Sequence, residues 1–221
     1  MKQPAFELAG VLFAVAGCVT RGEVLMPNES DAGTAPARAF SISVGDQHGC
    51  AVIQRRTFCW GSNDYGQLGI GTLENQLHPV AVTINSRVLQ VAVGAEHSCS
   101  LDDLGVVYCW GANDRGQLGL GDRDVRLAPT AVTLPTPATL IATKFRHTCA
   151  LLLDSTLFCW GDNTEGELGQ ADAFPDNDER AADGLLPLAV GDGAWRAVDT
   201  GDGHTCGVRN DGELMCWGRN S

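Results

Sequence analysis

Short apolar stretches bounded by turn residues recur along the chain and predict β-strands. Residues 149–153 are apolar at every position (Cys-Ala-Leu-Leu-Leu), which indicates a strand covered on both faces. Asn210-Asp211-Gly212 is a strong hairpin signal because backbone there must accept positive φ. Asp102–Gly105 is a weaker signal, and Arg55-Arg56 predicts a turn of another kind in the first repeat. No helical periodicity of ten or more residues separates the stretches, so the pattern predicts an all-β fold.

Three blocks of residues recur at intervals of about 50 residues. The first is G-x-x-H-x-C, with Lys144 in place of Gly in its third copy, and its histidines are His48, His97, His147 and His204. Each repeat predicts one strand before this block, one carrying His-x-Cys, one ending in Cys-Trp-Gly and one beginning near Pro-x-x-Val, where proline suits an edge strand. The second and third blocks are FCWGSNDYGQLG from Phe58, YCWGANDRGQLG from Tyr108, FCWGDNTEGELG from Phe158 and MCWGRN from Met215, then Pro79–Val82, Pro129–Val132 and Pro187–Val190.

This pattern resembles the repeat of the regulator of chromosome condensation (RCC1) family over residues 39–221. The resemblance implies a β-propeller, which in the family has seven blades. Here the repeats span about 39–87, 88–137, 138–193 and 194–221, and the fourth stops inside its second block. We therefore expect an all-β propeller of about four RCC1-like, four-stranded blades, partial or open, with the last strand missing. Stacked sheets would cover both faces of each strand, and open ends favour self-association.

The N-terminus differs in kind from the repeats. Lys2, the apolar run Leu8–Gly17 and then Cys18 are typical of a signal peptide over residues 1–17. Val15-Ala16-Gly17-Cys18 resembles the lipobox of bacterial lipoproteins, which implies that Cys18 is lipidated and holds the chain to a membrane. The alternatives are a plain signal peptide, or a buried helix or strand with an incidental cysteine. Residues 18–38 predict a solvated tether. The expected location is the cell envelope: outer membrane, periplasm or cell surface.

The other eight cysteines fall two per repeat, on successive strands of one hairpin. Opposed residues there have Cα atoms about 4.5 to 5.5 Å apart, within reach of a disulfide, and an exported chain meets an oxidising environment. The alternatives are reduced core thiols, or a metal held by His48, Cys50 and Cys59, for which no fourth ligand recurs. The predicted pairs are Cys50–Cys59, Cys99–Cys109, Cys149–Cys159 and Cys206–Cys216.

The repeated histidines and tryptophans suit structural roles. A histidine at one place in every repeat is expected to form a structural hydrogen bond. Trp60, Trp110, Trp160 and Trp217 are expected to pack between blades, with a row of sugar-stacking platforms as the alternative. The glycines of Gly66-Gln67-Leu68-Gly69 match no phosphate-binding pattern and predict turns.

The formal net charge is −12, which disfavours nucleic acid as a partner. The one irregular region, residues 171–184, lengthens the third repeat, and such variable loops carry binding specificity. Its carboxylates could instead hold a cation, although they do not match an EF-hand, or form a solvated acidic loop. The candidate binding-loop residues are Asp172, Asp176, Asp178 and Glu179.

No group of residues has the spacing of a catalytic triad, a metal hydrolase or a nucleotide site, so no catalytic residue, metal or cofactor is predicted. We expect an envelope-anchored propeller that mediates protein–protein interaction without catalysis, its protein partner unknown. The alternatives are an inhibitor of a secreted enzyme, since secreted β-lactamase-inhibiting propellers are similar in repeat type, a hydrolase that uses the acidic insert, and a carbohydrate-binding module. Nucleotide exchange on a small GTPase, known for the family's nuclear member, is disfavoured by the export signal and the acidic charge.

Overall fold

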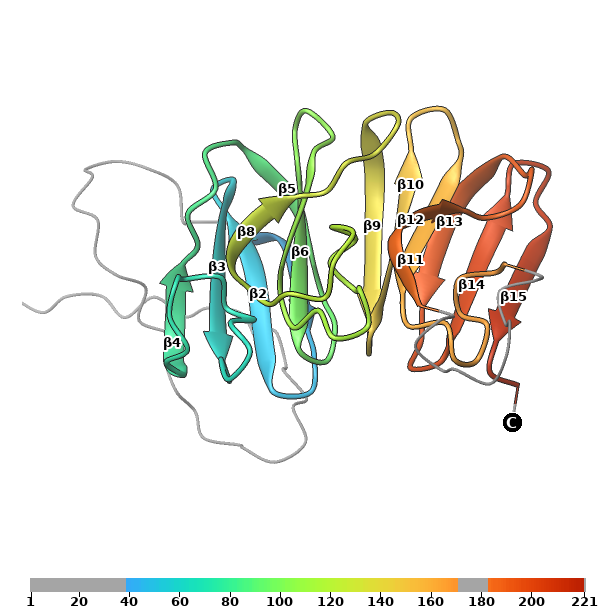
Figure 1. The fold of residues 1–221 in the computed structure, drawn as a ribbon. Helices are drawn as coiled ribbons and strands as arrows, with labels where there is room; N and C mark the ends of the chain where they lie inside the picture. The colour runs from blue at the N-terminus through green and yellow to red at the C-terminus, as the bar shows by residue number, and fades with distance from the viewer. Residues whose placement is uncertain (1–38, 171–182, 221) are drawn as a thin grey trace, which may run out of the picture. The chain divides into compact units, whose positions relative to one another are not determined.

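The computed structural model describes residues 39–170 and 183–220, and every regular element in this part is a β-strand (Figure 1). The all-β fold predicted from the sequence is therefore confirmed. The strands are β1 (Ala39–Val44), β2 (His48–Ile53), β3 (Arg56–Gly61), β4 (Gln76–Ala81), β5 (Val88–Val93), β6 (His97–Asp102), β7 (Val107–Gly111), β8 (Arg126–Ala131), β9 (Ala138–Lys144), β10 (His147–Leu152), β11 (Leu157–Gly161), β12 (Gly184–Ala189), β13 (Trp195–Thr200), β14 (His204–Arg209) and β15 (Leu214–Gly218).

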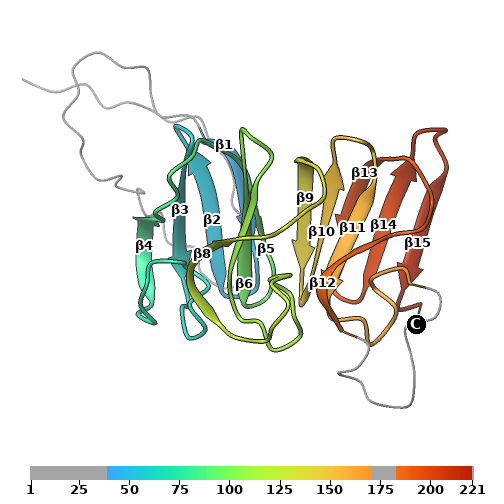
Figure 2. The ribbon, with the colours of Figure 1, turned by 45° about the horizontal axis from the view of Figure 1, so that its top comes forward.

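The strands form four antiparallel meanders, one per repeat (Figure 2). The orders are β1-β2-β3-β4, β5-β6-β7-β8, β9-β10-β11-β12 and β13-β14-β15. The fourth sheet has three strands among the described residues. Consecutive strands pair antiparallel, the first three of each sheet through short turns that reverse the chain.

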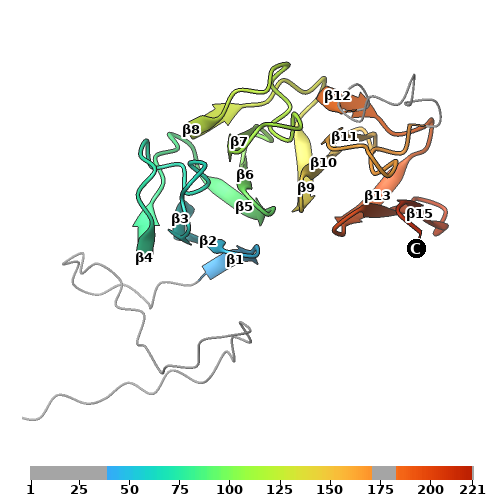
Figure 3. The ribbon, with the colours of Figure 1, turned by 60° about the horizontal axis from the view of Figure 1, so that its bottom comes forward.

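The four sheets follow one another with their first strands on one side and their fourth strands on the other (Figure 3). Contacts run from β1 and β2 to β5, from β5 and β6 to β9, and from β9 and β10 to β13. The first strands β1, β5, β9 and β13 together line an open hollow of about 260 Å³. This arrangement is an open rather than a closed propeller over the part of the chain that the structure describes.

Turn chemistry explains how each hairpin closes. Gln54 and Arg55 join β2 to β3 with φ of 50° and 66°, so the first hairpin uses a two-residue turn with both residues at positive φ. Gly105 and Gly212 supply positive φ in the second and fourth hairpins, at 80° and 98°. The fourth strands begin earlier than the sequence pattern predicts, because Pro-x-x-Val occupies the end of each strand rather than its start. As expected, proline lies only on edge strands.

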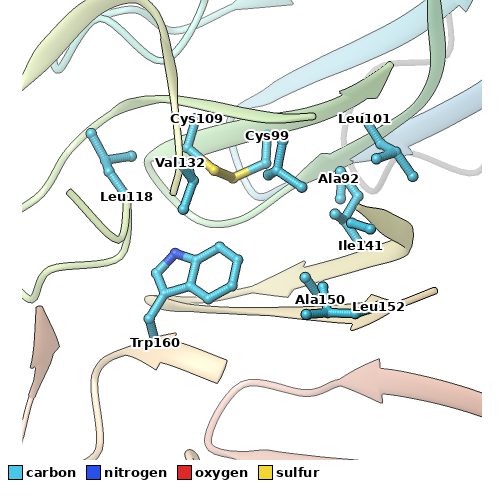
Figure 4. Packing of buried hydrophobic residues seen from close by; sticks show 12 residues of the cluster. Ala92, Cys99, Leu101, Cys109, Leu118, Val132, Ile141, Ala150, Leu152 and Trp160 are labelled. Atoms are coloured by element: carbon cyan, nitrogen blue, oxygen red, sulfur yellow. A yellow bond between two sulfur atoms is a disulfide. The ribbon is translucent and has the colours of Figure 1, made fainter. Parts of the chain in front are cut away.

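The hydrophobic core lies between the sheets rather than within one of them. Figure 4 shows the interface of the second and third sheets, where Cys99 and Cys109 face Trp160, Ile141 and Leu152. Equivalent clusters join the first sheet to the second and the third to the fourth. The second and third sheets are thus apolar on both faces, which explains the continuous apolar runs in their strands.

Candidate interaction surface

Four disulfides link the second and third strands of the four sheets. They are Cys50–Cys59, Cys99–Cys109, Cys149–Cys159 and Cys206–Cys216, the pairs expected from the sequence. In each pair the two cysteines are directly opposed in the β-ladder. A metal site would need free thiolates, and Cys50 and Cys59 are bonded to each other. The alternative that these two cysteines hold a metal together with His48 is therefore wrong.

A polar network crosses the apolar interface between the first two sheets. Ser98 donates its hydroxyl proton to the carbonyl of Gln67, at 2.9 Å. Since that proton is used, the Ser98 oxygen must accept from His48, whose Nε2 lies 2.9 Å away, and this assigns the ring proton to Nε2. The indole nitrogen of Trp110 donates to the same Gln67 carbonyl, at 2.9 Å. Two sheets are therefore joined through one backbone carbonyl.

The network repeats at the next two interfaces with the same geometry. His97 Nε2 lies 2.9 Å from Thr148 Oγ1, and His147 Nε2 lies 3.0 Å from Thr205 Oγ1. The threonines donate to the carbonyls of Gln117 and Glu167, which also accept from the indoles of Trp160 and Trp217. The structural role expected for the repeated histidines is confirmed at these three interfaces, and the residue after each histidine is part of it, which the sequence pattern did not reveal.

Burial keeps these histidines neutral. Desolvation lowers the pKa of His48 and of His147 to about 4, and it lowers the pKa of His97 to about 3. A charged imidazole would lose its hydration on burial, and at His147 this loss outweighs the opposing effect of the Asp162 carboxylate. These rings therefore act as fixed hydrogen-bond donors at neutral pH, and they are not available as proton-transfer groups.

The tryptophans pack between sheets, as the sequence predicts. Trp110 and Trp160 are fully buried, so neither ring can offer a face to a sugar. The approach is so close that a Cβ on Gly69 would lie 2.7 Å from the Trp110 indole nitrogen, at a residue whose φ is +69°. This glycine is required both for the turn and for the neighbouring ring. The carbohydrate-platform reading is therefore wrong for these two tryptophans.

The loops that follow the third strands are held by one asparagine per repeat. Asn63 accepts from the Leu68 backbone N–H at 2.9 Å and donates to the Thr72 carbonyl at 2.8 Å. Asn113 and Asn163 accept in the same way from the backbone N–H groups of Leu118 and Leu168. The asparagine of the Cys-Trp-Gly-x-Asn block thus fixes the backbone of the first residues of each loop, at 63–68, 113–118 and 163–168.

These loops share one end of the sheets with the turns between the first and second strands. Backbone N–H groups of Ser62, Ala112 and Asp162 donate to carbonyls in the turns of the same sheets. We call this end the loop surface; it consists of residues 45–47, 62–75, 94–96, 112–125, 145–146, 162–170 and 201–203. It carries the exposed aromatic residues Tyr65 and Phe145. It is the broadest irregular surface of the described chain and the best candidate for contacting a partner.

Ion pairs join neighbouring parts of the loop surface. Asp183, whose side chain is fully buried, receives a hydrogen bond of 2.7 Å from Arg123, and Arg115 lies 3.8 Å away. Burial raises the pKa of the Asp183 carboxyl, although the Arg123 bond opposes that rise. Arg146 lies 3.6 Å from Asp114. The sequence analysis did not single out these residues, because Asp183 belongs to the irregular insert and its partner lies 60 residues away.

Glu167 departs from the other repeats at a buried position of the loop surface. Gln67 and Gln117 accept from backbone N–H groups two residues earlier, and Glu167 accepts from Glu165 at 2.9 Å in the same way. Burial raises the pKa of Glu167 to about 7, and the carboxylates of Asp162 and Glu165 act in the same direction. The third repeat therefore holds a titratable group near neutral pH where its neighbours hold an amide.

Several predicted sites lie outside the described residues: the lipidation site Cys18 with the signal peptide and tether, and the binding-loop residues Asp172, Asp176, Asp178 and Glu179. Within residues 39–170 and 183–220, no group of three or more His, Cys, Asp or Glu side chains is placed to hold a metal ion. The same part of the chain contains no helix long and apolar enough to cross a membrane.

Two family models, both described as the regulator of chromosome condensation (RCC1) repeat, match this chain. One matches residues 56–101 and 105–151, and the other matches residues 88–117, 138–167 and 195–221. Together they cover more than half of the chain. The human RCC1-like G exchanging factor-like protein is similar to it, with 33% identity over 78 residues that make up 32% of this chain and 17% of that protein.

Solved structures agree with this assignment. Human WBSCR16 is similar at 27% identity with a TM-score of 0.72, over 82% of this chain and 47% of that one. Prp20p from Saccharomyces cerevisiae, a protein studied for its binding to Gsp1p and histones, has a TM-score of 0.70 at 22% identity and shares the fold, over 85% of this chain and 47% of that one. This chain spans less than half the length of each of these relatives. On the repeats, the sheet topology and these matches, the chain belongs to the regulator of chromosome condensation repeat family.

Proposed function

We propose that this chain is a non-catalytic, envelope-anchored interaction module that binds a protein partner through its loop surface. The observation that carries the proposal is that the repeated residues bond between sheets, whereas the residues that differ between repeats are exposed on the loop surface. At the three internal interfaces the repeated histidines, hydroxyl residues and tryptophans are occupied by hydrogen bonds between sheets. The loop surface instead varies from repeat to repeat, and it exposes Tyr65 and Phe145 together with paired charges. Exposed aromatic and arginine side chains on an ordered support are typical of protein contacts.

The similarity to Prp20p supports a protein rather than a small molecule as the partner, since that protein was studied for binding to other proteins. The net charge of −12 supports a partner that is not nucleic acid. The buried, neutral histidines offer no general base, which supports binding without chemistry.

Site-specific photocrosslinking in the exporting host tests the binding face. A photoreactive residue at Phe145 or Tyr65 should yield a discrete adduct with one protein, and the same residue at Leu153 is the control. Leu153 is more exposed than either, so the control is not limited by access, and it lies in the hairpin turn at the opposite end of its strand. Adducts of equal yield at Leu153, or none at Phe145 and Tyr65, would count against the loop surface.

The anchor is proposed from residues 15–18, which resemble a lipobox. Cys18→Ser should move the protein from the membrane fraction to the supernatant after cell disruption, because no acyl chain could be attached. Replacing Cys206 and Cys216 together by Ser is the control, since it removes two cysteines from the least buried disulfide without touching residue 18. Unchanged membrane attachment of Cys18→Ser would refute lipid anchoring and leave the binding face to be judged on the crosslinking result.

A further inference from the structure

The turn between the first and second strands of the third sheet differs in chemistry from the same turn of the other repeats. It reads Lys144-Phe145-Arg146, whereas the others read Gly45-Asp46-Gln47, Gly94-Ala95-Glu96 and Gly201-Asp202-Gly203. Two cations and an aromatic ring thus stand where the other turns are neutral or acidic. One sheet lies on each side of the third sheet, so the exposure of this turn does not depend on the ends of the series of sheets.

The backbone of this turn is strained at its phenylalanine. Glycine begins the turn of the second repeat because a Cβ on Gly94 would lie 2.3 Å from the His97 ring. Lys144 avoids that position, since β9 continues through it and pairs it with His147. Two residues then close the turn, with Phe145 at a φ of 47°, where glycine is preferred and a bulky residue is disfavoured. Folding does not explain a phenylalanine here, so the strain points to a use of its ring.

The turn is held from both sides and presents its ring at a fixed place on the loop surface. The backbone N–H groups of Ala95 and Asp162 donate to the carbonyls of Phe145 and Arg146, each at 2.9 Å. The Arg146 guanidinium lies over the Phe145 ring, 5.4 Å from its centroid. The ring itself is 39% exposed. An accessible aromatic ring with a stacked arginine is the chemistry of an interface hot spot.

The charge of this turn is available to a partner. Lys2 and Lys144 are the two lysines of a chain whose net charge is −12. Within residues 39–170 and 183–220, Lys144 forms no ion pair, although Glu96 lies in the neighbouring turn. Arg146 faces Asp114 at 3.6 Å, with side chains 31% and 56% exposed, so solvent screens that pair. A partner carboxylate would be attracted to this turn and repelled by the acidic remainder, which would fix its orientation.

We propose that the turn Lys144-Phe145-Arg146 is the anchor of the partner contact, and that the partner is a protein with an apolar pocket bordered by a carboxylate. Phe145 enters the pocket, and the Lys144 ammonium binds the carboxylate. A lysine suits this role because its charge is compact and its stem is flexible. The inference rests on the proposed binding through the loop surface, and it adds the residues that anchor the partner and the chemistry that the partner must offer.

Coupling by a water-soluble carbodiimide in the exporting host tests the chemistry of the partner. The reagent activates a carboxylate, and an amine in contact with it displaces the activating group to form an amide. Because Lys144 is the only lysine after residue 2, the parent should give one product in which Lys144 is joined to an Asp or Glu of one protein, as mass spectrometry of the linked peptides would show. Lys144→Arg keeps the charge but has no amine, so this product should be absent while the photoadduct formed at Phe145 remains.

Two substitutions in the turn test the anchor. Lys144→Glu should lower the yield of the photoadduct at Phe145 about tenfold or more, because like charges would face each other. Arg87→Glu is the matched control, since it makes the same change of charge at an exposed residue beside the hairpin turns, at the opposite end of the sheets. Phe145→Gly should lower the yield of the carbodiimide product about tenfold or more. Its unfolding midpoint in urea should not fall, because glycine accepts positive φ without strain.

The outcomes separate this inference from the proposed function. A parent that forms the photoadduct but no amide between Lys144 and an Asp or Glu would overturn the carboxylate partner. An unchanged photoadduct in Lys144→Glu, or an unchanged product in Phe145→Gly, would overturn the anchor and leave binding through the loop surface standing. If the parent gave neither the photoadduct nor the amide, the proposed function would be refuted and this inference with it.

Discussion

The substitution Glu167→Gln should stabilise the protein at pH 8 and have little effect at pH 4.5. Glu167 is 3% exposed, and burial raises its pKa to about 7 from an ordinary value of 4.5. The folded protein thus binds this proton more tightly than the unfolded chain does. Folding stability is not reduced below pH 4.5, falls as the pH rises from 4.5 to 7, and is constant above 7.

The size of the effect follows from the two pKa values. Their separation corresponds to a destabilisation of at most about 3 kcal/mol at pH 8. Gln67 and Gln117 show that an amide fits this position and accepts the same backbone hydrogen bond. Because Gln does not ionise, we expect Glu167→Gln to raise the free energy of unfolding by about 1 to 3 kcal/mol at pH 8.

Urea unfolding followed by tryptophan fluorescence at pH 4.5, 6, 7 and 8 would measure the difference between the variant and the parent, with disulfides intact. The difference is the informative quantity, because buried histidines change the stability of both proteins in the same way. Gln117→Glu is the matched control, and it should lose stability as the pH rises, the more so because Gln117 donates to Asp114. A difference between Glu167→Gln and the parent that does not change from pH 4.5 to 8 would refute the reasoning.

Three further outcomes are expected. Lowering the pH from 6.5 toward 4 should destabilise the protein, because the unfolded chain binds protons at His48, His97 and His147 that the folded protein does not bind. In NMR spectra, three of the five imidazoles should still be neutral at pH 5.5. Protonation of all five at that pH would contradict this. Trp160→Phe should lower the free energy of unfolding, measured in urea, by about 1 to 2 kcal/mol, because the hydrogen bond to the Gln117 carbonyl is lost. Trp60→Phe is the control, since Trp60 is half-buried, and it should lower that free energy less. Equal losses in the two variants would argue against the network. Replacing Cys99 and Cys109 together by Ala should lower the free energy of unfolding by about 3 kcal/mol or more, since it removes a disulfide that closes a loop of about ten residues inside a packed interface. The same change at Cys206 and Cys216 should lower it less, because that disulfide is partly exposed. A lower thermal midpoint for the second variant than for the first would be inconsistent with the packing.

Much of the fold could be predicted because the repeat places equivalent residues at equivalent strand positions. His-x-Cys and Cys-Trp-Gly each mark one strand, and their opposed cysteines define the register of the hairpin. The continuous apolar run at residues 149–153 indicated coverage on both faces, and the interfaces on either side of the third sheet confirm it for residues 149–152. Leu153 lies beyond the end of β10 in the hairpin turn and is exposed, so the prediction is wrong for that residue. Such local patterns predict the fold because equivalent residues have equivalent surroundings at each interface between sheets.

The features that the sequence did not reveal depend on contacts between distant positions. The hydrogen bond between Arg123 and Asp183 joins a loop of the second repeat to the irregular insert of the third, and no periodic signal connects them. Glu167 appears in the sequence as a conservative change from Gln67 and Gln117; only its burial turns that change into a shifted pKa. The acceptor role of the Gln67 carbonyl was also invisible, since a backbone group has no sequence signature.

The repeated residues join the sheets to one another, so selectivity for a partner must come from residues that differ between repeats. One such position of the loop surface precedes a turn glycine in each of the first three repeats, and it is occupied by Tyr65, Arg115 and Glu165 in succession. The glycine keeps the backbone the same, while the side chain changes from an aromatic ring to a cation and then to an anion. A partner that spans adjacent sheets would therefore meet a fixed spacing with a different chemistry at each step. Tyr65 and Glu165 are both exposed, and exchanging them would retain the composition and reverse that order, so the exchange should weaken partner binding with little change in the unfolding midpoint.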